Sequence, residues 1–246
     1  MNDISINNNG IRLGIVIPLA NEEKTISCLL DKVLKQINEA DIVFCVLDNV
    51  SKDNTKKIIE EYSMQDNRVH LIWAPENRCI VDAYIRGYKE ALYRNCKWIL
   101  EMDGGLSHNP EEIHRFIANM SKGYDFAAGS RFITGSNYKG FSYRYIISRG
   151  GTLLANIILK TKMKDMTSGF ECFTHNALSY VLKKGIKSRA HFFQTEIRAL
   201  LRDWNWVEVP ISYSNPSARL KKESIFEAFR NLRQLSKEMK TKQEEI

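Results

Sequence analysis

The chain has 246 residues, 43% of them hydrophobic, which is enough to bury the core of one large domain or of a domain with an appended segment. No window approaches the roughly 18 consecutive apolar residues of a membrane-spanning helix, and the polar N-terminus lacks the apolar region of a signal peptide. Five cysteines without paired spacing favour reduced thiols over a disulfide framework or a zinc cluster. We therefore expect a folded protein that stays in the cytoplasm.

The net charge of +7 is unevenly distributed along the chain. Residues 1–130 carry 15 Lys and Arg against 19 Asp and Glu, whereas residues 131–246 carry 21 against 10. A basic half of this kind can face nucleic acid, anionic lipid or phosphorylated substrates, and charge alone does not choose among them.

Apolar, β-branched runs alternate with segments of helical spacing over the first hundred residues. The runs predict buried strands at 11–18, which Pro18 is expected to end, and at 43–47, 69–73 and 98–102. The segments between them predict helices at 22–37, at 51–62 with Ser51 as the N-cap, and at 80–93. This alternation predicts an α/β fold with a doubly wound, mostly parallel sheet, in which ligands bind at the carboxyl ends of the strands.

The pattern loosens after residue 130. It predicts helices near 144–159 and 192–202 and a strand at 207–212, and then a basic amphipathic helix at 224–240. On that last helix, Ile225, Phe229, Leu232 and Leu235 share one side. We expect one domain at 1–213, followed by a basic segment and helix at 214–246.

Three strand ends carry a resemblance to a known family. The segments VIPLANEE, VLDNVSKDNT and EMDGGLSHNPEE resemble the sugar-nucleotide binding segments of family-two glycosyltransferases, and in particular of polyprenol- or dolichol-phosphate mannose synthases. The resemblance extends over residues 11–213 and implies the GT-A fold of nucleotide-diphospho-sugar transferases. It implies that 1–213 is a catalytic domain, with a donor half at about 11–130 and an acceptor half at about 131–213. Each acid alone also suits an ordinary loop or helix N-cap, but the set in this order is far more specific.

The resemblance implies a donor site with a divalent cation. Glu22 and Asp48 would accept hydrogen bonds from the nucleobase or ribose. Asp103 would be the ligand of Mg²⁺ or Mn²⁺, beside glycines that let the backbone approach a diphosphate. The donor-binding residues implied in this segment of the chain are Pro18, Glu22, Asp48, Asp103, Gly104 and Gly105.

The chain departs from the family pattern within these segments. The family's Asp-x-Asp followed by a Gln has Gly105 and Ser107 in this chain, which removes one carboxylate from the metal site. The cation would then be held more weakly, or mostly by phosphate oxygens and water. Ala20 replaces the usual aromatic residue and the usual glycines after Asn77 are absent, which leaves the base open between guanine and uracil.

His108 would be either a ligand or a polar loop residue.

The basic half contains segments that resemble the acceptor site of the same family. GSRF at 129–132, followed by Arg144 and Ser148, resembles the part that holds the lipid phosphate, and DMTSGF at 165–170 supplies Ser168 and Gly169. Guanidinium forks at Arg131 and Arg144 suit a phosphate monoester, and these two residues and Asp103 are the catalytic candidates. Alternatively, Arg144 solubilises a surface helix, and its apolar neighbours form either a membrane-interface segment or a core helix.

Two further segments are assigned by the resemblance. FFQTEI at 192–197 places Gln194 and Glu196 near the site, although Glu196 also suits a structural acid. In SARLKKES at 217–224, Arg219 and Lys221 are charge-equivalent candidates for clamping the leaving diphosphate.

The function implied is an inverting transfer of a hexose, mannose favoured, from a GDP- or UDP-linked donor to polyprenyl phosphate. The protein would associate peripherally with the cytoplasmic membrane surface and would not bind nucleic acid. A lipid monophosphate, with a second pKa of about 6, is already ionised and needs no general base. The alternatives are a transferase acting on a saccharide, a non-catalytic sugar-nucleotide binding subunit, and a nucleic-acid binding protein, the last suggested only by the basic half.

Overall fold

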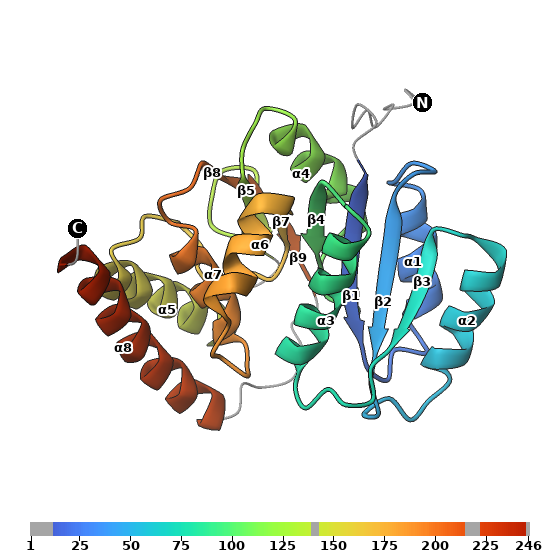
Figure 1. The fold of residues 1–246 in the computed structure, drawn as a ribbon, viewed down its shortest axis with the longest axis horizontal. Coiled ribbons are helices and arrows are strands. Elements are labelled where there is room, and N and C mark those ends of the chain that lie inside the picture. The colour runs from blue at the N-terminus through green and yellow to red at the C-terminus, as the bar shows by residue number, and fades with distance from the viewer. Residues whose placement is uncertain (1–11, 139–142, 215–221, 245–246) are drawn as a thin grey trace.

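The computed structural model describes residues 12–138, 143–214 and 222–244. A central sheet of seven strands, in the order β3-β2-β1-β4-β7-β5-β8, has helices on both faces, and a two-stranded sheet pairs β6 with β9 (Figure 1). The strands are β1 (Leu13–Leu19), β2 (Ile42–Leu47), β3 (Val69–Trp73), β4 (Trp98–Glu101), β5 (Phe126–Ser130), β6 (Asn137–Tyr138), β7 (Glu171–Thr174), β8 (Trp206–Pro210) and β9 (Ser212–Tyr213).

The helices follow the strands in a mostly alternating order. They are α1 (Ile26–Leu34), α2 (Thr55–Gln65), α3 (Ile80–Tyr93), the 3-10 helix η1 (Pro110–Glu112), α4 (Ile113–Met120), α5 (Tyr143–Leu159), α6 (His175–Lys184), α7 (Phe192–Leu200) and α8 (Lys222–Glu244). The helices α5, α7 and α8 lie together at the end of the molecule away from β3 (Figure 1).

The strand directions confirm the predicted doubly wound, mostly parallel sheet. β1 runs parallel to both β2 and β4, and β5 runs parallel to β8. β7 is inserted antiparallel between β4 and β5. Side chains alternate between two buried apolar clusters, so that Val16 and Phe44 face one and Ile17 and Cys45 face the other. Burial on both faces explains why the central strands are continuous apolar runs in the sequence.

Two predicted local features are wrong. Pro18 does not end β1, which continues to Leu19. The backbone of Val16 faces β4, where its carbonyl accepts from the Met102 N–H, and residue 18 faces the same side beyond the end of β4. No ladder partner there requires the N–H that proline lacks. Ser51 is not an N-cap, because α2 begins only at Thr55.

In the second half the three predicted helices are present, with differences at their ends, whereas β6, β7 and α6 were not predicted. α5, α7 and α8 lie where helical spacing placed them, whereas the strand expected at 207–212 is divided between β8 and β9. On α8, Leu232 and Leu235 are buried while Phe229 is half exposed, and the side chain of Ile225 lies outside the described residues. None of the helices in the described ranges is long and apolar enough to cross a membrane.

Candidate active site

The donor segments converge because their strands are neighbours. β1 lies between β2 and β4, and all three run in the same direction, so their carboxyl ends meet at one edge of the sheet. This arrangement brings the segments that contain Glu22, Asp48 and Asp103 to one edge, as the sequence predicted.

Asn21 joins the loop that follows β1 to the loop that follows β2. Its side-chain oxygen accepts from the Lys52 N–H at 2.8 Å, its amide nitrogen donates to the Val50 carbonyl at 3.2 Å, and its backbone N–H donates to Ser51 Oγ at 3.1 Å. The residue has a φ of 57°, in the left-handed region that asparagine tolerates better than most residues. The Ser51 hydroxyl therefore serves this junction instead of capping α2, and Asn21 fixes the loops around Glu22 and Asp48.

In both Glu22 and Asp48, one carboxylate oxygen accepts a hydrogen bond from a residue nearby in the sequence. Glu22 Oε2 accepts from Thr25 Oγ1 at 2.6 Å, and Asp48 Oδ1 accepts from the Val50 N–H at 2.9 Å. These bonds orient both groups before a ligand arrives.

The glycines after Asp103 allow a close approach between two strand ends. A Cβ atom at Gly104 would lie 2.4 Å from Leu19 Cδ2 and 3.1 Å from the Pro18 carbonyl oxygen. A Cβ atom at Gly105 would lie 3.4 Å from Glu22 Oε1. Position 104 therefore requires glycine, and position 105 points toward a carboxylate already in the site.

Asp103 is oriented by two hydroxyl groups. Tyr84 Oη donates to its Oδ1 and Ser107 Oγ donates to its Oδ2, both at 3.1 Å. Burial, and then the nearby Asp103 charge, raises the pKa of Tyr84 well above its usual value, so that Tyr84 remains a hydrogen-bond donor. The Asp103 side chain is 43% exposed and can reach a ligand.

His108 holds the backbone of the Asp103 segment in place. Its Nδ1 accepts from the Asp103 N–H at 3.2 Å, and its ring stacks on Phe170 with centroids 4.9 Å apart. The ring is buried, and burial lowers its pKa, which favours the neutral form that accepts this bond. His108 Nε2 lies 3.9 Å from Asp103 Oδ2.

The donor set at Asp103 fits a hard cation that takes few ligands from the protein. Asp103 offers carboxylate oxygens at the pocket, the Ser107 hydroxyl lies beside it, and Glu22 Oε1 borders Gly105. The described residues contain no cluster of three or more His, Cys, Asp or Glu arranged to hold a metal. Mg²⁺, which keeps several waters and binds phosphate oxygens, is compatible with such a set.

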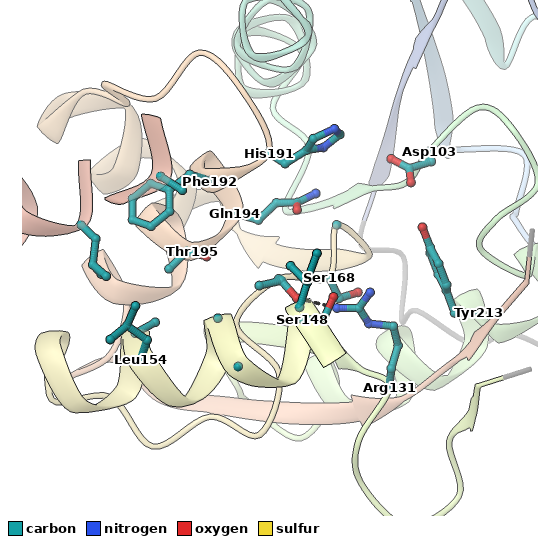
Figure 2. A pocket seen from close by; sticks show the side chains of 18 of the residues that line it. Asp103, Arg131, Ser148, Leu154, Ser168, His191, Phe192, Gln194, Thr195 and Tyr213 are labelled. Atoms are coloured by element: carbon teal, nitrogen blue, oxygen red, sulfur yellow. Dashed lines mark hydrogen bonds between the residues drawn. The ribbon is translucent and has the colours of Figure 1, made fainter. Parts of the chain in front are cut away.

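A pocket of about 490 Å³ extends from Asp103 toward α8. Figure 2 shows Asp103 and Tyr213 at one end, Arg131, Ser148 and Ser168 in the middle, and Leu154 and Phe192 at the other end. The apolar end is completed by Phe229 and Leu232 of α8. Arg131, Ser148, Ser168 and Gly169, predicted from separate segments, all line this one pocket.

Arg131 is buried and paired, which the sequence did not indicate. Its Nε and Nη2 donate to the two oxygens of Asp165 at 2.7 and 2.9 Å, and Nη2 also donates to Thr167 Oγ1 at 2.6 Å. Burial alone would raise the pKa of Asp165, but the charge and hydrogen bonds of Arg131 lower it to about 2. Much of the predicted phosphate-binding fork is therefore engaged within the protein, although Arg131 still lines the pocket.

The remaining predicted residues differ in placement. Arg144 lies in the first turn of α5, but its side chain is outside the described part of the chain, and so are Arg219 and Lys221. Gln194 lines the pocket; its amide is satisfied when the nitrogen donates to the Thr167 carbonyl and the oxygen accepts from the Gly169 N–H. Glu196 is instead a structural acid, since it accepts from the backbone at Lys187 and Ser188.

Several pocket residues were missed by sequence reasoning. Tyr138 and Tyr213, from the small β6-β9 sheet, form part of the wall, and Arg131 lies 5.3 Å from the Tyr213 ring centroid. Two-residue strands leave no periodic signal in the sequence, so nothing in the pattern marked them.

A doubly wound sheet with an acidic edge, opening on a pocket that a second half of the chain completes, is the architecture of a GT-A glycosyltransferase. The chain belongs to glycosyl transferase family 2, whose model matches residues 14–182. This confirms the predicted fold and enzyme class.

Characterised relatives are similar over most of the chain. A polyprenol monophosphomannose synthase of Mycolicibacterium smegmatis is 26% identical over 214 residues, which are 85% of this chain and 80% of that protein. An undecaprenyl-phosphate mannosyltransferase of Micrococcus luteus is 27% identical over 82% of this chain and 84% of its own length. A dolichol-phosphate mannosyltransferase of Pyrococcus furiosus is 28% identical over 92% of this chain and 64% of its own length.

Solved structures share the fold at lower identity. Glucosyl-3-phosphoglycerate synthase of Mycobacterium tuberculosis, in complex with Mn²⁺, UDP and phosphoglyceric acid, superposes with a TM-score of 0.70 at 14% identity, covering 93% of this chain and 80% of that one. Its complex with Mg²⁺ and UDP gives a TM-score of 0.69 at 13% identity, covering 96% of this chain and 85% of that one.

Proposed function

We propose that this glycosyltransferase moves a hexose, mannose favoured, from a GDP- or UDP-linked donor to a polyprenyl phosphate, with inversion at the anomeric carbon. The proposal rests on how the lining of the pocket changes along its length. The pocket begins at the acidic donor edge, continues through polar side chains and ends between apolar side chains of α5, α7 and α8. An acceptor with an anionic head and an apolar tail matches this order of surfaces.

The donor half would bind the nucleotide sugar at Pro18, Glu22, Asp48, Asp103, Gly104 and Gly105. Carboxylates that are already oriented can accept hydrogen bonds from ribose or base without a large ordering cost. A divalent cation bound at Asp103 would neutralise charge on the departing diphosphate. Relatives in the solved structures bind UDP with Mn²⁺ or Mg²⁺, which supports a metal-assisted donor site.

The acceptor half would hold the phosphate with Arg131, Arg144, Ser148, Ser168 and Gly169. Nε and Nη2 of Arg131 donate to the Asp165 carboxylate, so the Nη1 edge of the guanidinium would remain for a phosphate oxygen in the pocket. Because the phosphate monoester is already ionised, catalysis would depend on positioning its oxygen in line with the anomeric carbon. Arg219 and Lys221, outside the described residues, stay candidates for the diphosphate.

The face formed by α5 and α8 supports attachment to a membrane surface. On α5, the exposed Ile146, Leu153 and Ile157 recur at helical spacing, and Ile157 is 68% exposed. On α8, Phe226 is 75% exposed and borders a shallow groove with the basic residues Arg230, Arg233 and Lys237. Apolar side chains flanked by cations are typical of helices that lie in the headgroup region of anionic bilayers.

A radioactive transfer assay tests the function. The wild-type protein, Mg²⁺ or Mn²⁺ and a panel of GDP- and UDP-hexoses are incubated with polyprenyl phosphate, 3-phosphoglycerate or an oligosaccharide. We expect label to enter only the polyprenyl phosphate, with one donor strongly preferred. Transfer to 3-phosphoglycerate or the oligosaccharide in its place would establish a soluble-acceptor enzyme and refute the proposal.

The same assay tests the role of Arg144. A charge-assisted hydrogen bond contributes about 1.5 to 3 kcal/mol, so Arg144→Ala should raise the acceptor KM by about tenfold to a hundredfold with little change in donor binding. Arg94→Ala is the matched control, since Arg94 pairs with Glu90 on α3 outside the pocket. Loss of donor affinity with a normal acceptor KM would place Arg144 at the diphosphate.

A further inference from the structure

Arg198 on α7 is a fully buried arginine with an unusual set of partners. Its Nε pairs with Glu171 Oε1, and its Nη2 donates to the carbonyl oxygens of Gly129 and Ser168 at 3.0 Å each. Its Nη1 donates to the carbonyl oxygen of Asp165. One planar guanidinium thus connects a helix, a strand end and a loop.

The three carbonyls belong to the segments that build the acceptor side of the pocket. Gly129 precedes Arg131 by two residues, Asp165 is the counter-ion of Arg131, and Ser168 itself lines the pocket. Asp165 is fixed at both ends, because its carboxylate binds Arg131 and its carbonyl binds Arg198. The position of the Arg131 guanidinium therefore depends on Arg198 in two ways, through the backbone that continues from Gly129 and through the ion pair with Asp165.

The same helix carries pocket residues on its first turn. Phe192, Gln194 and Thr195 of α7 line the pocket, and Thr195 Oγ1 also donates to the Met166 carbonyl at 2.7 Å. Arg198 thus ties α7 to the two other segments that line the pocket near Arg131 and Ser168.

The carboxyl groups near Arg198 are buried with few hydrogen-bond partners, which costs free energy of folding. Glu101 faces Glu171 across the β4-β7 ladder, and both oxygens of Glu101 and Oε2 of Glu171 accept no hydrogen bond from the residues that the structure describes. Burial raises the pKa of Glu171 to about 7 against the opposing charge of Arg198. A buried ion pair of this kind adds little net stability compared with apolar packing, so its value lies in the geometry it imposes.

We propose that Arg198 is a positioning residue of the acceptor-phosphate site, which clamps Gly129, Asp165 and Ser168 so that Arg131 and Ser168 meet the phosphate in the correct register. The inference rests on the proposed acceptor. Arg198 touches no substrate, since its guanidinium is entirely enclosed by protein.

The test separates the clamp from the ion pair. Arg198→Lys keeps a cation opposite Glu171 but loses the planar fork that reaches three carbonyls. The double variant Glu171→Met with Arg198→Met replaces the pair by apolar side chains of similar size, which is often neutral or stabilising. Arg68→Lys is the matched control: Arg68 also pairs with an acid, Asp66, and donates to the Leu34 and Ile37 carbonyls at 3.2 Å, but it lies outside the pocket.

Binding is measured by calorimetry with farnesyl phosphate for the acceptor and with GDP and UDP in Mg²⁺ for the donor. Thermal unfolding is followed in parallel to establish that each variant is folded. We expect Arg198→Lys and the double variant to bind farnesyl phosphate about tenfold more weakly, which is the effect of losing about one hydrogen bond to the phosphate. Nucleotide affinity should change less than twofold, and Arg68→Lys should bind both ligands normally.

Normal farnesyl phosphate binding by folded Arg198 variants would overturn the inference. Parallel weakening of phosphate and nucleotide binding would also overturn it, because a general structural defect affects both halves. If the wild-type protein binds nucleotide but not farnesyl phosphate, the proposed acceptor is wrong, and this result is distinct from failure of the clamp alone.

Discussion

Replacement of Asp165 by Asn tests the pairing that holds Arg131. The substitution keeps the size of the side chain but removes the charge opposite Arg131, a residue that is only 8% exposed. Removing one partner of a buried ion pair costs about 3 to 5 kcal/mol, because the remaining charge is left uncompensated. We expect Asp165→Asn to lower the free energy of unfolding at neutral pH by this amount.

The pH dependence of this loss follows from the pKa of Asp165. The pairing lowers the pKa from 3.8 to about 2, and each unit corresponds to about 1.4 kcal/mol, which gives about 2 kcal/mol of stabilisation. Since the pKa is lower in the folded state, the stabilisation is complete well above pH 3.8 and is lost as the pH falls toward 2. The difference between wild type and variant should therefore shrink by about 2 kcal/mol between about pH 5 and pH 2.

The assay is urea unfolding followed by circular dichroism at pH 7, 5, 4, 3 and 2.5. Below pH 5, Glu171, with a pKa of about 7, is protonated in both proteins and does not contribute to the difference. Asp125→Asn, immediately before β5 and outside the pocket, is the control. A difference that stays constant from pH 5 to 2.5 would refute the assignment of Asp165 as the ionised partner of Arg131.

Three further predictions concern the proposed metal site and the proposed membrane attachment through α5 and α8. Asp103→Ala should abolish transfer. The melting temperature should change little, because the Asp103 side chain is 43% exposed, and near-normal turnover would exclude the metal role. Gly105→Asp would place a second carboxylate beside Glu22, so a titration with Mn²⁺ should reach half-maximal activity at a lower concentration; an unchanged titration would show that position 105 does not face the ion. Ile157→Glu should reduce co-sedimentation with anionic vesicles several-fold while leaving nucleotide binding intact, and unchanged sedimentation would exclude α5 from the membrane face.

The donor half could be predicted from the sequence because its signals are local. Buried parallel strands such as β2 are uninterrupted apolar runs, and their bounds in the structure lie within a residue or two of the prediction. The polar residues after them meet at one edge because parallel neighbours end together. The family resemblance then supplied roles for these residues that geometry alone does not assign.

The acceptor half was harder to predict because its organisation is non-local. β7 has only four residues and begins with a glutamate, which conceals a buried strand within an apparently amphipathic segment. Arg131 and Asp165 are 34 residues apart, so their pairing leaves no spacing signal. Arg198, placed between hydrophobic residues of α7, has the pattern of an exposed helix position, although it is completely buried.

These placements change what the positive charge of the second half means. Arg131 and Arg198 are buried with acidic partners, so they count toward the charge of this half without adding to its outer surface, and only Arg131 lines the pocket. The cations Arg230, Arg233 and Lys237 of α8 line a groove together with phenylalanines. A surface that binds nucleic acid combines cations with polar side chains that contact phosphates and bases. A surface with apolar side chains between cations is instead suited to lipid headgroups and acyl chains. The exposed charge therefore supports the proposed attachment to a lipid surface rather than binding of nucleic acid, and Phe229 of the same helix also lines the apolar end of the pocket.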